Sequence, residues 1–234
     1  NLSNIQGANV SGAVASATVV GNGAMAATNT GAVNSAFGQN ALAANTSGIG
    51  NTALGNAAMF SNTTGYYNNA VGYAALYTNT TGVQNNAIGY LSLAYNTTGG
   101  HNTAVGYSAL ANNTTASNNV AVGYQALSSN TTASYNTSVG YQALLDNTTG
   151  AGNVALGFQS LANNTTASNN IAVGYQALLD NTTGFQNVAL GHSALANNTT
   201  ASNNTAVGYH ALTTNTTGTS LTALGVNALA NNTT

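Results

Sequence analysis

The sequence predicts an all-β fold, a repetitive β-solenoid (parallel β-roll) with coils of 17 residues. One glycine recurs every 17 residues from Gly21 to Gly225, and no insertion interrupts the spacing. A uniform period gives every unit one conformation and one way to contact its neighbour, which is typical of stacked arrays. The apolar side chains are mostly Ala, Val and Leu, with four Phe and no Trp, and they suit a thin core.

The repeat also sets the domain organisation. Residues 1–20 are the least regular part, and their small residues and drifting alternation predict an extended leading linker. Residues 21–234 form one continuous array of repeats. The first copy, residues 21–37, is atypical, as terminal repeats commonly are, because one of its faces has no neighbour.

Each repeat has a short segment on either side of its glycine. The segment before it, as in residues 119–122, alternates and contains β-branched residues, which predicts a short strand. The segment after it, as in residues 124–127, has Tyr124 and Leu127 three positions apart. A second strand is the favoured interpretation there, and a single helical turn is the alternative. The glycine between them predicts a corner.

Two apolar columns are expected to form the core, with a column of small residues, nearly all Ala, directly before the second. The first column precedes each glycine and consists of Phe37, Leu54, Val71, Ile88, Val105, Val122, Val139, Leu156, Val173, Leu190, Val207 and Leu224. The second column lies four positions after each glycine and consists of Leu42, Met59, Leu76, Leu93, Leu110, Leu127, Leu144, Leu161, Leu178, Leu195, Leu212 and Leu229.

A polar corner follows, in which one asparagine per coil precedes Thr and then Thr or Ser. With coils about 4.8 Å apart, we expect these amides on the outside, hydrogen-bonded to the asparagines above and below. The tripeptides also match the acceptor pattern for N-glycosylation. The alternative is that Asn and Thr serve only as turn and ladder residues. The candidate glycan acceptors are Asn45, Asn62, Asn79, Asn96, Asn113, Asn130, Asn147, Asn164, Asn181, Asn198, Asn215 and Asn232.

Charge is nearly absent, since the chain has no Lys or Arg and two acidic residues. Phosphate binding needs cations, so nucleic acid and anionic membrane surfaces are poor candidates as partners. No run of about 20 apolar residues predicts membrane insertion. Cysteine is absent, which excludes disulfides and thiolate sites. Exposed amides and hydroxyls pair readily with sugars, so cell-surface glycans are expected partners.

No group of residues predicts catalysis. Asp146 and Asp180 lie in one column two coils apart, roughly 10 Å by the coil spacing, which is too far to share a metal ion. An inverting glycosidase pair can have a similar separation, but both residues stand where other coils mostly carry Asn, Ser or Thr, and we expect solvated corners. His101, His192 and His210 fall in three different columns and are not expected to converge. We therefore expect no enzyme activity, cofactor or metal.

The repeats carry a resemblance to surface fibres. Residues 118–123 (Asn-Asn-Val-Ala-Val-Gly) and 169–174 resemble the strand-and-glycine repeat in the heads of trimeric autotransporter adhesins. The longer pattern, with Gly-Tyr-Gln-Ala-Leu and Asn-Thr-Thr-Gly, is similar to repeats in bacteriophage tail-fibre-like proteins, and residues 7–12 resemble linkers of such fibres. The resemblance covers essentially the whole chain, although these coils are longer than those of the adhesin heads. It implies an extracellular homotrimeric fibre on a cell or virion surface that binds a receptor, and it implies no catalytic residues.

A tyrosine stripe is a separate reason to expect a homotrimer. Such an apolar stripe is larger than a solitary chain normally exposes, and packing three stripes together would bury it. Rings stacked on the outside of a monomeric solenoid are the alternative. The stripe consists of Tyr73, Tyr90, Tyr107, Tyr124, Tyr141, Tyr175 and Tyr209.

The sequence therefore favours an extracellular structural fibre, as shaft or head, that mediates surface attachment or receptor binding. A passive glycan-coated filament that binds nothing specific is the first alternative. An ice-binding solenoid is a more distant one, because regular threonine columns present a lattice of hydroxyls and methyls. One such column contains Thr46, Thr63, Thr80, Thr97 and Thr114.

Overall fold

The computed structural model describes residues 17–25 and 29–234, so most of the predicted linker at residues 1–20 lies outside the described part. Strands of three residues recur at the predicted spacing of 17 and pair in parallel, as β2 (Ser35–Phe37) and β3 (Thr52–Leu54) do. The predicted all-β parallel solenoid is confirmed. The described residues contain no helix long and apolar enough to span a bilayer.

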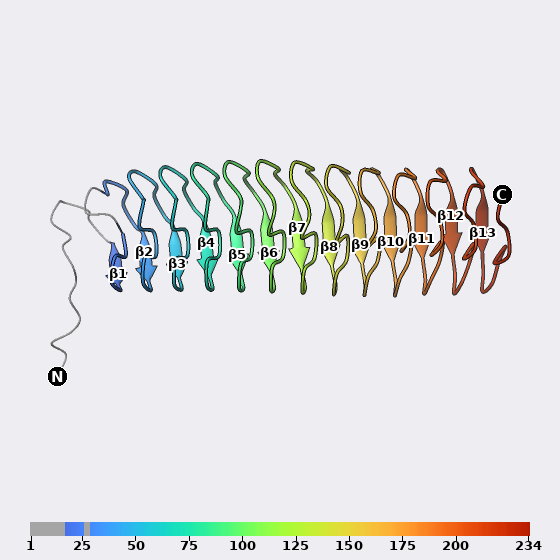
Figure 1. Cartoon of the computed structure of the whole chain (residues 1–234), viewed down its shortest axis with the longest axis horizontal. Helices are drawn as coiled ribbons and strands as arrows, with labels where there is room; N and C mark the ends of the chain where they lie inside the picture. The colour runs from blue at the N-terminus through green and yellow to red at the C-terminus, as the bar shows by residue number, and fades with distance from the viewer. Residues whose placement is uncertain (1–16, 26–28) are drawn as a thin grey trace, which may run out of the picture. The chain divides into compact units, whose positions relative to one another are not determined.

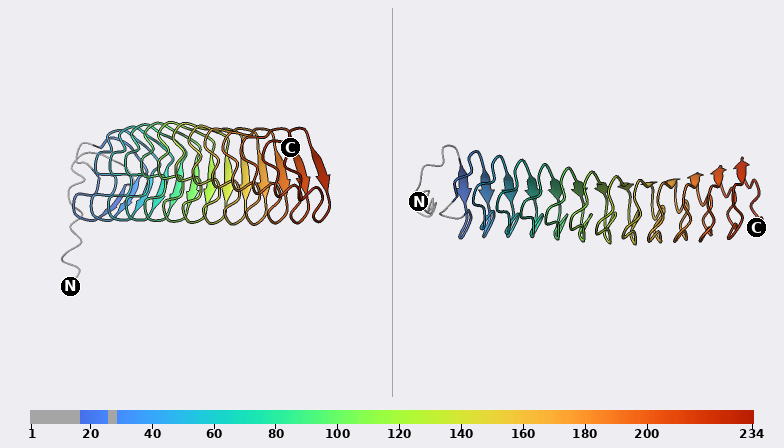
Figure 2. Two further views of the ribbon diagram at one scale, coloured as in Figure 1. Left: turned by 45° about the vertical axis from the view of Figure 1, so that its right-hand side comes forward. Right: turned by 90° about the horizontal axis from the view of Figure 1, so that it is seen from above.

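The chain divides into two compact units, an N-terminal unit that ends at Ser117 and a C-terminal unit from Asn118 to Thr234. Within each unit, successive strands lie side by side on one face of the coils (Figures 1 and 2). The N-terminal unit contains β1 (Thr18–Val20), β2, β3, β4 (Asn69–Val71), β5 (Asn86–Ile88) and β6 (Thr103–Val105). The C-terminal unit contains β7 (Val120–Val122), β8 (Thr137–Val139), β9 (Val154–Leu156), β10 (Ile171–Val173), β11 (Val188–Leu190), β12 (Thr205–Val207) and β13 (Thr222–Leu224).

The core contains the predicted leucine column as far as Leu212, but not its last member, Leu229, which is 48% exposed, and not the column that precedes each glycine. Leu42 through Leu212 are buried at this position, as is Met59, and so are the small residues directly before them. In strands β2 to β13, however, the middle residue points inward, as Ala104 and Ala121 do. Because side chains alternate along a strand, the first and third residues point outward. The prediction for the column before each glycine is therefore wrong, and Leu54, which belongs to it, is 49% exposed.

The segment after each glycine is neither a strand nor a helical turn, so both interpretations of it are wrong. Gln125 and Leu127 have φ values of 52° and 53°, in the left-handed region. The amide of Leu127 donates to the carbonyl of Ala143 in the next coil at 3.0 Å. The hydrogen bonds thus run from coil to coil, as in a sheet, while the backbone bends. A leucine in this conformation costs about 1–2 kcal/mol, which burial of its side chain offsets.

Candidate binding surface

The asparagines of the Asn-Thr-Thr corners lie inside the coils, not outside. Every one from Asn45 to Asn215 has 0% exposure. Asn79 is representative, because its Nδ2 donates to Oδ1 of Asn62 at 2.8 Å and to the carbonyl of Gly82 at 3.0 Å. The expected amide ladder is present, but its predicted outward orientation is wrong. The reason is that the chain turns carbonyl groups inward at this corner, and the amides satisfy them.

Burial changes the assessment of the predicted glycan acceptors. An Nδ2 atom that donates two hydrogen bonds inside a coil has no room for a sugar. The folded coils therefore offer no accessible acceptor at Asn45, Asn62, Asn79, Asn96, Asn113, Asn130, Asn147, Asn164, Asn181, Asn198 or Asn215, whereas Asn232 is half-buried. Among the described residues, four further acceptor patterns begin at exposed asparagines, Asn112, Asn197, Asn203 and Asn231, and these were not predicted.

A second buried asparagine column was also missed. It lies directly before each strand from β2 to β12, and all its members have 0% exposure. Asn68 donates from Nδ2 to the carbonyl of Gly82 at 2.9 Å, and its Oδ1 accepts the backbone N–H of Asn85 at 2.9 Å. The carbonyl of Gly82 thus accepts from both columns. The signal was available, because an asparagine occupies this position in every repeat from Asn34 to Asn204.

Aromatic rings form a column on the outside of each unit, directly after the recurring glycine. In the C-terminal unit the rings of Tyr124, Tyr141, Phe158 and Tyr175 stack with centroids 5.1–5.2 Å apart. In the N-terminal unit, Tyr90 stacks on Tyr73 at 5.2 Å. The tyrosines of the predicted stripe, Tyr73, Tyr90, Tyr107, Tyr124, Tyr141, Tyr175 and Tyr209, are 42–51% exposed.

A glutamine column lies beside the aromatic column in the C-terminal unit. Nε2 of Gln142 donates to Oε1 of Gln125 at 3.0 Å, and the bonds from Gln159 and Gln176 continue the ladder at 3.1 Å. Stacked aromatic rings and amide groups therefore stand next to each other along this surface.

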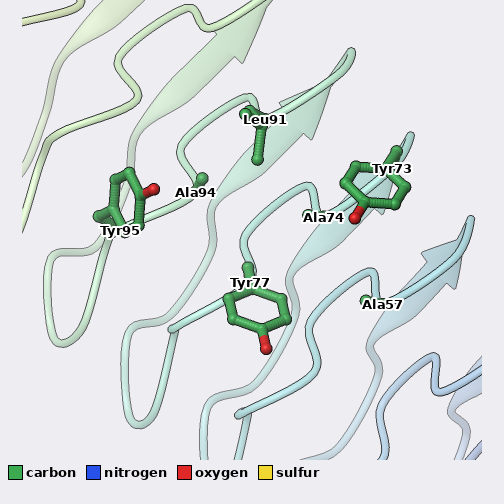
Figure 3. Close-up of a pocket in the computed structure, with 7 residues that line it drawn as sticks. All are labelled: Ala57, Tyr73, Ala74, Tyr77, Leu91, Ala94 and Tyr95. Carbon is green, nitrogen blue, oxygen red and sulfur yellow. The ribbon is translucent and has the colours of Figure 1, made fainter.

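The N-terminal unit lacks this glutamine ladder and is hollowed instead. A hollow of about 270 Å³ lies among residues 57–95, and the rings of Tyr73, Tyr77 and Tyr95 stand around it (Figure 3). Ala74 and Ala94 are buried and contribute only methyl groups to its lining.

The acidic and imidazole side chains of the described residues are those of two aspartates and three histidines. Oδ1 of Asp180 accepts from Nδ2 of Asn163 at 2.9 Å, and Asp146 is exposed. His192 and His210 do meet, against expectation, because their coils are adjacent and their ring centroids are 5.5 Å apart. His101 lies exposed on a loop of the N-terminal unit. The described residues include no group of three or more His, Cys, Asp or Glu that could hold a metal ion.

The sequence and the fold were compared with protein families, curated proteins and solved structures. No protein family, curated protein or solved structure matches the chain.

Proposed function

We propose that this chain is part of an extracellular structural fibre on a cell or virion surface, and that its outer surface binds neutral cell-surface glycans. The observation that supports this function is the exposed column of stacked aromatic rings, with centroids 5.1–5.2 Å apart from Tyr124 to Tyr175. The ring column and the glutamine column together offer apolar ring surface beside amide donors and acceptors.

This surface matches the chemistry of a neutral sugar. A sugar ring has a face of C–H groups, which packs on the negative face of an aromatic ring, and a rim of hydroxyls, which pair with amides. Stacking between coils holds the rings in place before a ligand arrives, so little side-chain freedom is lost on binding. Acidic sugars are disfavoured, because the chain has no Lys or Arg to pair with a carboxylate.

The outer face of the strands supports self-association into the homotrimer that the resemblance implies. In the C-terminal unit this face carries Val120, Val139 and Ile171, each more than a third exposed. Such a row of branched apolar side chains favours burial against further copies of the chain. Light scattering in solution tests this part of the proposal, with three chains per particle as the expected mass and one chain as the contradicting one.

The two alternatives have less support. A glycan on every coil is incompatible with buried acceptor amides. In the threonine column named for ice binding, the hydroxyl of Thr63 donates to the carbonyl of Thr80 and that of Thr80 donates to Thr97, at 3.0 and 3.1 Å. These hydroxyl protons therefore stabilise the stack.

Retention on immobilised polysaccharide tests the proposed function. Dextran, mannan and galactan serve as neutral probes, and alginate serves as the anionic control. We expect the chain to be retained by at least one neutral polymer and to pass over alginate. A double variant, Tyr141→Ala with Tyr175→Ala, should weaken retention, and Tyr135→Ala, at an exposed tyrosine outside the column, should not. Passage of the unmodified chain over all three neutral polymers would contradict the proposal.

A further inference from the structure

The hollow in the N-terminal unit is a local departure from the repeat. Its volume is about 270 Å³, and its lining comes from three successive coils, at residues 57, 73–77 and 91–95. This is close to the lower end of the range for ligand pockets, which start near 300 Å³, and it suits a single small ring.

The hollow exists because two columns change their residues here. At the second position after the glycine, the C-terminal unit has Gln125, Gln142, Gln159 and Gln176, whose side chains cover the surface. The same position in the hollow holds Ala57, Ala74 and Leu91. After the leucine column along the chain, the side chains of Tyr77 and Tyr95 line the sides of the hollow. Short side chains on the floor and long rings at the rim therefore make the depression.

The walls are held in place before any ligand binds. The ring of Tyr77 stacks on Phe60 at 5.2 Å, and the ring of Tyr73 stacks on Tyr90 at 5.2 Å. Tyr95 is half exposed and closes the hollow on another side (Figure 3). Three tyrosine side chains and the methyl groups of Ala74 and Ala94 thus line one small volume.

We propose that this hollow binds one neutral hexopyranose unit of a polysaccharide, an inference that rests on the proposed function and gives it a site. The C–H face of the sugar packs on tyrosine rings, and its hydroxyls pair with the phenol groups at the rim. The chain contains no Lys or Arg that could pair with a uronate, a sialate or a phosphate. An uncharged sugar therefore fits this hollow better than an acidic one.

Filling the hollow tests the proposal with little risk to the fold. Ala74→Gln introduces the side chain that the C-terminal unit carries at this position, where the backbone φ is 49°, against 52° at Gln142. Ser108→Gln is the matched control, because Ser108 lies in the same column with φ of 50° and outside the hollow. Circular dichroism checks that both variants keep the fold.

The binding probes are the methyl glycosides of glucose, mannose and galactose, followed by saturation-transfer NMR and titration. We expect at least one of them to bind the unmodified chain and Ser108→Gln equally, and Ala74→Gln to bind it about tenfold more weakly. Tyr95→Ala should cause a similar loss by removing one wall, while Tyr135→Ala, at a tyrosine of the C-terminal unit, should cause none.

The outcomes separate the site from the function. If the unmodified chain binds a neutral polysaccharide and Ala74→Gln and Tyr95→Ala bind it and the glycosides equally well, the hollow is not the site and the proposed function stands. If the polysaccharide binds and no methyl glycoside does, the hollow is again overturned. If neither polysaccharide nor glycoside binds the unmodified chain, the site and the proposed function both fail.

Discussion

The N-terminal and C-terminal units have the same interior and different outer surfaces. Inside, both stack the same two asparagine columns and the same leucine column, all buried. Outside, Ala57 and Ala74 stand in the N-terminal unit where Gln142 and Gln159 form a ladder in the C-terminal unit. The first strand position likewise changes from Asn69 in β4 to an exposed Ile171 in β10.

The difference shows which positions the fold constrains. An interior residue contacts its own copies in the coils above and below, so a change at one coil disturbs three. An outer residue contacts solvent on one side and is free to vary. Specific recognition is therefore expected where an outer column changes, as it does around the hollow, and mutations inside should affect both units alike.

The largest effect is expected at the recurring glycine. Gly72 and Gly140 have φ values of 136° and 140°, and a Cβ at either would collide with the carbonyl oxygen of the next glycine in the stack, Gly89 or Gly157. Strain and overpacking together should lower the free energy of unfolding by about 4 kcal/mol for Gly72→Ala and Gly140→Ala alike. Urea unfolding followed by circular dichroism measures this loss. A small loss of stability in one unit and a large loss in the other would contradict the claim that the two units have the same interior.

The next largest effect is expected in the asparagine ladder. Asn96 donates to Asn79 at 2.8 Å and accepts from Asn113 at 2.8 Å, and Asn164 has the equivalent partners in the C-terminal unit. Asn96→Ala and Asn164→Ala should each lower the free energy of unfolding by about 2–3 kcal/mol, because buried partners lose their hydrogen bonds.

The control for the ladder is a threonine on the surface next to it. Thr98 and Thr166 are exposed, and their replacement by alanine should change stability by less than about 0.5 kcal/mol. Equal losses for the asparagine and threonine variants would mean that the buried amides contribute no more to stability than the exposed threonine side chains do.

A smaller gain is expected at His210, in the outer column of the C-terminal unit that also contains the glutamines. Its Nε2 is buried and has no hydrogen-bond partner among the described residues. Gln occupies the same position in four other coils with φ of 50–52°, close to the 54° of His210. His210→Gln should therefore raise the free energy of unfolding by about 1 kcal/mol, measured by thermal or urea unfolding. A loss of stability would show that the stacked imidazole outweighs the unpaired nitrogen.

The smallest effect concerns glycans, and it distinguishes exposed from buried asparagines within the same coil. When the chain is expressed in a host that performs N-glycosylation, sugar should appear on exposed Asn112, Asn197 or Asn203 and not on buried Asn113 or Asn198. Glycopeptide mass spectrometry assigns the positions. Sugar on the buried asparagines of folded material would contradict the inward orientation of their amides.

The fold could be predicted from the sequence because the glycine period permits only one arrangement of equivalent coils. Which columns point inward and which point outward could not be predicted. Asparagine is normally exposed, and the sequence does not reveal that Asn79 finds its partner one coil away in Asn62. The strand of three residues is also too short for its alternation to distinguish Leu54, outside, from Ala53, inside.

The candidate site was predicted only in part. The tyrosine stripe was visible as a column, and its position on the surface follows from the corner at each glycine. The hollow was not visible, because it depends on residues from three coils at once. Ala74, Tyr77 and Tyr95 are unremarkable in their own repeats, and they meet only when the coils stack.

Hydrogen exchange of asparagine side-chain amides, followed by NMR, tests the central claim most directly. The account predicts that the Nδ2 protons of the buried columns, such as those of Asn79 and Asn164, exchange orders of magnitude more slowly than those of exposed Asn112 and Asn203, in both units. Exchange at one common, unprotected rate for all of these amides would contradict it.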